Sequence, residues 1–115
     1  MADPILRRKA KPTTGRINMK VVQIHYYLTT PGGDYASLGE YIKGLGSWAH
    51  IHESLWLVRT NKSVAEVRDE IASRMRSTDR VVVFSMTADS WASFNIGGDV
   101  AEWMHEHLGT SPVAA

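Results

Sequence analysis

Hydrophobic and polar residues alternate in the first patterned segment of the chain, residues 20–28 (KVVQIHYYL). Val22, Ile24 and Tyr26 fall on one face of an extended chain, and His25 falls on the other. β-branched and aromatic residues are frequent here, as they are in strands generally. The pattern therefore predicts a β-strand.

A break and a change of period follow this strand. Residues 30–33 (TPGG) interrupt the alternation, and Asp34 is placed to cap a helix. Gly44 and Gly46 are expected to end that helix. Its apolar positions recur at helical spacing and comprise Leu38, Tyr41, Ile42 and Leu45.

Two extended runs, residues 47–53 and 54–60, come next and meet near Glu53 and Ser54. They predict a tight β-hairpin. The second run carries apolar residues on both faces, with Leu55 and Leu57 on one and Trp56 and Val58 on the other.

The sequence signature of a capping box starts a second helix. The Ser63 hydroxyl can accept a hydrogen bond from the backbone N–H of Glu66, and the Glu66 carboxylate can accept one from the N–H of Ser63. The apolar stripe expected to be buried on this helix comprises Val64, Val67, Ile71 and Met75.

Residues 81–84 (VVVF) are apolar without interruption. Such a strand is typical of burial on both faces or of contact with a partner chain. Between residues 87 and 98 the pattern weakens, and a short fifth strand is one interpretation. A cap signature at Asp99 then predicts a final helix with one apolar side, formed by Val100, Trp103, Met104, His107 and Leu108.

The predicted order, β-α-β-β-α-β and a short C-terminal helix, indicates an α+β fold of the ferredoxin-like sandwich type over residues 19–108. Residues 109–115 are expected to fray. Both longer helices lie on one face of the antiparallel sheet in such a fold. We expect the second face to be left for solvent, a second copy or a ligand, because no further element is assigned to it.

Composition narrows the classes of protein to which the chain can belong. It has 115 residues, 13 basic and 12 acidic side chains and no cysteine, which fits one globular domain. No apolar run approaches the roughly 18 residues of a membrane span. Without cysteine, disulfides and thiolate zinc sites are excluded. We therefore expect a cytoplasmic protein without membrane contact.

Charge is distributed unevenly along the chain. Residues 1–18 contain five basic residues and one acidic residue, whereas residues 19–115 contain eight and eleven. We expect residues 1–18 to form a disordered basic arm; an alternative is that the protein starts at Met19 and the arm is not native. The acidic body argues against a domain that wraps a phosphate backbone.

Three strings of the sequence resemble a known family. They are IHYYLTTPGGDYASLGEYIKGLGSWAH, ESLWLVRTNKSVAEVRD and the tryptophan-bearing segment before the terminal helix. Over residues 19–108 they resemble the small bacterial SinR-family proteins, which are similar to VapD toxins and to the small CRISPR-associated adaptation protein. The resemblance implies a ferredoxin-like homodimer.

One position departs from that family pattern. Relatives end the first strand with Tyr-Asp-Leu, and the resemblance implies that this Asp binds the metal ion for phosphodiester hydrolysis. Here the string is Tyr26-Tyr27-Leu28. A phenol is neutral near pH 7 and is a poor ligand for Mg²⁺. We therefore expect no cofactor, with Mg²⁺ as the alternative, and we favour a protein that is not an enzyme.

Histidine chemistry offers a second set of candidate residues. His50 and His52 are two apart on a predicted strand and are expected to share a face, and His25 is expected on the same sheet. Three imidazoles suggest a zinc site, but this spacing alone is a weak signal, so we expect no metal.

Cleavage of RNA without a metal is the other hypothesis for these imidazoles. His25 would act with His50 or His52 as acid and base, and Arg59 or Lys62 would stabilise charge. Arg59 and Lys62 are also the candidate nucleic-acid contacts.

Three functions are compatible with these sequence features. The favoured one is a non-catalytic homodimer of the SinR family that serves as a structural or nucleic-acid-docking module for RNA or DNA. The alternatives are a small toxin-like endoribonuclease, with His25, Tyr27, His50 and His52 as candidate catalytic residues, and a protein-binding accessory factor.

Overall fold

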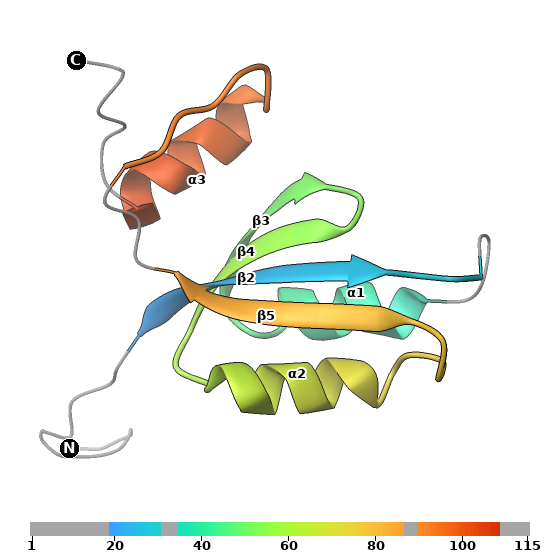
Figure 1. Cartoon of the computed structure of the whole chain (residues 1–115). Helices are drawn as coiled ribbons and strands as arrows, with labels where there is room; N and C mark the ends of the chain where they lie inside the picture. The colour runs from blue at the N-terminus through green and yellow to red at the C-terminus, as the bar shows by residue number, and fades with distance from the viewer. Residues whose placement is uncertain (1–18, 31–34, 87–89, 109–115) are drawn as a thin grey trace, which may run out of the picture.

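The residues that the structure describes form a four-stranded antiparallel sheet with three helices (Figure 1). The structure is a computed structural model and describes residues 19–30, 35–86 and 90–108. The predicted α+β class is thus confirmed. The proposed basic arm, the Asp34 cap and the proposed C-terminal tail all lie outside the described residues.

The strands are β2 (Lys20–Tyr27), β3 (Ser47–His52), β4 (Leu55–Thr60) and β5 (Arg80–Met86). They are ordered β3-β4-β2-β5, and every neighbouring pair is antiparallel. β3 and β4 form the predicted hairpin, because His52 pairs with Leu55 across a two-residue turn. β2 and β4 are the two inner strands, and β3 and β5 form the edges.

Helices α1 (Ala36–Lys43) and α2 (Val64–Ala72) cover one face of the sheet (Figure 1). Their buried side chains pack against the even-numbered residues of β2 and β4. The stripe predicted for the second helix is confirmed, although Met75 follows its last turn. The buried members of this core are Val22, Ile24, Leu38, Ile42, Trp56, Val58, Val67 and Ile71.

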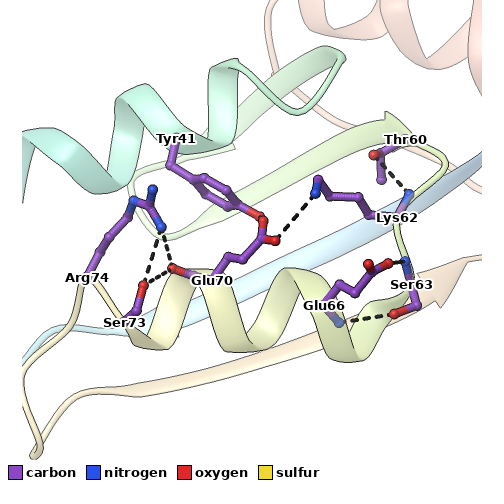
Figure 2. Close-up of polar contacts among 8 residues, drawn as sticks. All are labelled: Tyr41, Thr60, Lys62, Ser63, Glu66, Glu70, Ser73 and Arg74. Atoms are coloured by element: carbon purple, nitrogen blue, oxygen red, sulfur yellow. Dashed lines mark hydrogen bonds and ion pairs between the residues drawn. The ribbon is translucent and has the colours of Figure 1, made fainter.

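The predicted capping box fixes the start of α2. The Glu66 N–H donates to Ser63 Oγ at 3.0 Å, and the Ser63 N–H donates to Glu66 Oε1 at 2.8 Å (Figure 2). These bonds satisfy backbone donors that the first turn of a helix leaves free. The helix therefore begins where the sequence places it.

Helix α3 (Gly98–Leu108) lies on the other face of the sheet (Figure 1). Trp103 and Met104 are buried there against Val21, Ala49 and Leu57, and the Trp103 indole donates to Ser47 Oγ at 2.8 Å. The expectation that no element covers the second face is therefore wrong. The apolar side predicted for this helix is what attaches it to the sheet.

Two smaller expectations about the C-terminal part also need correction. Residues 90–97 contain no strand, so the proposed fifth strand is not found in the described part of that segment. The last helix begins at Gly98, which places Asp99 inside its first turn and not at the cap. Its Oδ1 accepts a hydrogen bond from the N–H of Val100.

Within the described ranges, no helix has both the length and the apolar character needed to cross a membrane.

Two glycines provide a matched test of this fold. An added Cβ at Gly46 would lie 2.1 Å from the backbone oxygen of Arg59, whereas one at Gly39, inside α1, meets nothing within 4 Å. We expect Gly46→Ala to lower the free energy of unfolding by about 2 kcal/mol or more. Gly39→Ala should raise it by about 0.5–1 kcal/mol, because alanine favours a helix. Urea unfolding of both variants checks this, and equal effects would contradict the described approach of Gly46 to β4.

Candidate functional site

Among the described residues, α3 and the segment before it pack on the second face of the sheet over β3 and β4, and their cluster also includes Val21 of β2 and Met86 of β5. Towards β5, this face exposes large apolar side chains: Tyr27 is 63% exposed, Val82 46% and Phe84 51%. We call this region the open face. It consists of Gln23, His25, Tyr27, Arg80, Val82 and Phe84, which are cross-strand partners in β2 and β5 and therefore share one side of the sheet.

His25 and Phe84 make an edge-to-face contact in the middle of the open face. The rings of His25 and Phe84 meet at 5.8 Å with an interplanar angle of 89°. His25 Nε2 also lies 2.9 Å from the side-chain oxygen of Gln23. The imidazole is thus held against an exposed phenylalanine and is directed towards the side of the sheet that α1 and α2 do not cover.

Tyr27 lies at the end of the open face, opposite Arg80 in the neighbouring strand. A shallow pocket of about 390 Å³ is formed there by His25, Tyr26, Tyr27, Arg80, Val81 and Val82. The position at which the family resemblance implies a metal-binding Asp is therefore open to ligands. The phenol of Tyr27 lines this pocket together with the imidazole of His25 and the guanidinium of Arg80.

Tyr26 points to the helix side and is part of a hydrogen-bond chain. The Trp56 indole donates to the Tyr26 hydroxyl at 2.9 Å, and that hydroxyl donates to the backbone oxygen of Glu53 at 2.9 Å. Burial raises the pKa of Tyr26; the hydrogen bond from Trp56 opposes this rise, and the Glu53 charge adds to it. The chain ties the end of β2 to the β3–β4 turn.

A second pocket, of about 490 Å³, lies beside this chain. Its walls come from the end of β2, the β3–β4 turn and the start of the first helical segment, and they include Tyr26, Tyr27, Thr30, Tyr35 and Ser54. Tyr26 and Tyr27 line both pockets.

His50 and His52 are separated by an irregularity in the β3–β4 pairing. His50 pairs with Trp56 and stacks on its indole at 3.7 Å, whereas His52 pairs with Leu55. Leu55 and Trp56 are successive residues of β4 and point to opposite faces of the sheet. The expectation that both histidines share a face is therefore wrong, because the extra residue in β3 breaks the simple alternation.

This arrangement separates His25 from His50. His25 lies on the side of Leu55, its partner in β4, and His50 lies on the side of Trp56. One phosphate within a single chain cannot lie between these two imidazoles. His52 shares the Leu55 side with His25, with one strand between them. Among the described residues, no group of three or more His, Asp or Glu side chains is placed to hold a metal ion.

Arg59 and Lys62, the candidate nucleic-acid contacts, lie apart from the open face. Arg59 pairs with Val21 at the far end of β2 from Tyr27. Lys62 Nζ lies 3.3 Å from Glu70 Oε2 of α2 (Figure 2). The structure does not bring either cation to His25.

Glu70 also accepts a hydrogen bond from the Tyr41 hydroxyl, which joins α1 to α2 (Figure 2). This hydrogen bond, together with Lys62 and against the effect of partial burial, lowers the pKa of Glu70. Arg74 lies over the Tyr41 ring at 4.3 Å. The cluster therefore holds the two helices together.

Asp79, which directly precedes β5, makes a second link, to Thr29 beyond the end of β2 and to Tyr35 before α1. Its carboxylate accepts hydrogen bonds from the N–H and hydroxyl of Thr29 at 2.8 and 3.0 Å, from the Tyr35 hydroxyl at 3.3 Å and from the Arg76 N–H at 2.9 Å. Partial burial would raise its pKa, but these hydrogen bonds outweigh that effect and lower it. The carboxylate of Asp79 thus holds the segment that follows β2 in place.

Sequence reasoning missed Arg80, Val82 and Phe84 as residues of a candidate site. The signal was present, because the uninterrupted apolar run of residues 81–84 predicted burial on both faces or a partner chain. β5 is instead an edge strand with Val82 and Phe84 exposed. Burial on both faces within one chain is therefore wrong, and the partner chain stays a prediction.

Comparison of the chain with protein-family models, with curated proteins and with solved structures found no significant match in any of the three.

Acid sensitivity tests the role assigned to Asp79. Its pKa is lowered in the fold, so the unfolded chain binds its proton at higher pH, near 3.9. The stabilisation is complete above that value and is lost as pH falls towards the folded pKa. We expect Asp79→Asn to have a lower free energy of unfolding than the parent at pH 7. Between pH 7 and pH 3, the variant should lose less of this free energy than the parent does. Urea unfolding across this range measures both, and equal acid losses in the two proteins would contradict the role.

Proposed function

We propose that this protein is a homodimeric structural or docking module without catalytic activity of its own. The observation that carries the proposal is the open face, where Tyr27, Val82 and Phe84 are about half or more exposed beside β5, an edge strand of the sheet that the described residues form. Exposed apolar patches that a monomer leaves uncovered are typical of interaction surfaces. A second copy of the chain is the first proposed partner, at the edge of the sheet beside this patch, and the proposed location is the cytoplasm.

We also propose that the fold is ferredoxin-like and that the protein is a member of the SinR family. The order of elements up to β5 is β-α-β-β-α-β, and the strand order β3-β4-β2-β5 puts the first and third strands in the centre. Both features support this fold. The family assignment rests on the sequence strings that resemble it.

The absence of catalysis is proposed from the chemistry of Tyr27. A carboxylate at this position would supply a charged oxygen to Mg²⁺, whereas a phenol near pH 7 does not. The placement of the histidines supports the same proposal, because acid–base cleavage needs two groups at one phosphate: His50 lies on the opposite face from His25, and His52 shares the face of His25 but lies across β4 from it.

RNA or DNA is the proposed further partner of the dimer. Tyr27 and Phe84 offer exposed rings on which bases can stack, and Arg80 adds a cation that makes no contact with an acidic side chain of the described residues. A protein partner is the alternative that the apolar character of Val82 and Phe84 favours.

A toxin-like endoribonuclease is the second candidate function, and one observation favours it. His25, Tyr27 and Arg80 line a single open pocket. An imidazole could act there as a base while the guanidinium stabilises charge on a phosphate.

Static light scattering tests the dimer. At micromolar concentration we expect the full chain to have the mass of two chains, also in 0.5 M salt, because apolar contacts are not screened. Phe84→Lys should shift the mass towards one chain. Phe94→Lys, at a 91% exposed site outside the open face, is the matched control and should not. A parent with the mass of one chain would refute the homodimer.

A cleavage assay tests the lack of catalysis. The full chain is incubated with labelled single- and double-stranded RNA and DNA in the presence of Mg²⁺, Mn²⁺ or EDTA. We expect no cleavage by the parent. Cleavage by the Tyr27→Asp variant with Mg²⁺ or Mn²⁺, but not in EDTA, would show that a carboxylate at this position is enough to give a metal-dependent activity. Cleavage by the parent that is lost in His25→Ala would support the endoribonuclease instead.

A further inference from the structure

The two edges of the sheet differ in how well they could accept another strand. β3 has six residues and carries the irregularity between His50 and His52. Irregularities discourage pairing at an edge. β5 has seven residues and pairs with β2 without any irregularity. β5 is therefore the edge that remains suited to pairing.

The outer side of β5 also lacks the usual obstacles. Its sequence, RVVVFSM, contains no proline, and its only charged residue is Arg80 at the start. In the described ranges 19–30, 35–86 and 90–108, its backbone makes no hydrogen bond to any element except β2. Every second residue of an edge strand directs its N–H and C=O outwards, so β5 presents a row of donors and acceptors that no strand of the described residues uses.

We propose that β5 of two copies pairs antiparallel about a two-fold axis at Val83, which rests on the homodimer proposed above. The partner is a second copy of this chain. Two four-stranded sheets then join edge to edge into one sheet of twice as many strands. The contact is isologous, because the same strand serves both copies.

The register follows from the alternation of side chains. Residues that face each other across an antiparallel pair must point to the same side of the sheet, so the numbers of two partners must have an even sum. The axis therefore passes through one residue of β5. Only an axis at Val83, the centre of Arg80–Met86, pairs all seven residues of the strand.

The resulting side-chain pairs are complementary on the open face. Phe84 lies opposite Val82 of the partner subunit, and an aromatic residue facing a β-branched one is a stabilising cross-strand pair. Both side chains are about half exposed in the single chain, at 51% and 46%. Arg80 lies opposite Met86 of the partner subunit, so the two arginines stand at opposite ends of the contact and do not repel each other.

The axis runs perpendicular to the sheet and therefore keeps the faces of the two copies aligned. The open faces of both copies join on one side, and α1 and α2 of both copies lie on the other. Val83 packs against the helix-side core, so this arrangement brings it near its symmetry mate, whereas stacking of two open faces would keep the two Val83 side chains apart. Position 83 thus distinguishes the two ways of forming a dimer.

Disulfide trapping tests the pairing, and the absence of native cysteine makes every cross-link unambiguous. Facing residues of an antiparallel pair have Cα atoms about 4.5–5.5 Å apart, within the range that a disulfide spans. Under mild oxidation of the full chain, Val83→Cys should form a covalent species of two chain masses. His52→Cys, at an exposed position on the other edge strand, is the matched control and should stay a single chain.

A mixing experiment tests the register at exposed positions that do not touch the core. Val82→Cys and Phe84→Cys should each cross-link weakly alone, because like positions are offset along the strands. An equal mixture should give a strong cross-link between the two variants.

Light scattering on the same parent protein separates the two proposals. A parent of two chain masses in which Val83→Cys fails to cross-link would overturn the β5 pairing and leave the homodimer standing. A parent of one chain mass would overturn both. Circular dichroism would show whether the Val83→Cys variant fails to fold. In that case the mixture of Val82→Cys and Phe84→Cys tests the pairing, and a mixture that gives no cross-link would overturn it.

Discussion

Burial of the first part of β2 on both faces, at Val21, Val22 and Ile24, is the constraint on which the rest of the structure depends. Val22 and Ile24 are completely buried on the helix side, and Val21 is 6% exposed on the other. A strand that is apolar on both sides needs hydrogen-bonded neighbours at both edges and a covering layer on each face. β4 and β5 supply the neighbours, α1 and α2 cover one face, and α3 covers part of the second.

The incomplete cover of the second face gives the protein its candidate site. α3 packs near β3, where Trp103 bonds to Ser47. β5 therefore keeps Val82 and Phe84 exposed while its inner edge completes the pairing of β2. The same strand that stabilises the centre of the sheet thus offers an apolar surface and, among the described residues, an edge that no other strand pairs with.

Sequence patterns predicted the elements well and their packing only in part. The alternation in residues 20–28, the hairpin turn and the Ser63–Glu66 capping box are local features, and each has a local physical cause. The apolar side of the last helix was also evident. A helical pattern shows which side is buried but not what covers it, so the place of α3 over β3 and β4 was missed.

The candidate site was harder to predict, because it depends on tertiary arrangement. The pair His50 and His52 had the spacing of a shared strand face, and one irregularity in the pairing separated them. The exposure of Val82 and Phe84 depends on β5 being an edge strand, which only the strand order reveals. Tyr27 was identified from the family resemblance and does lie in an open pocket.

Amide hydrogen exchange along β5, followed by NMR at increasing protein concentration, tests the proposed pairing of this edge most directly. In a single chain, only those amides from Val81 to Ser85 that donate to β2 should be protected, since the others point outwards. We predict that the outward amides become protected as the dimer forms. Outward amides that exchange rapidly at every concentration would contradict the pairing.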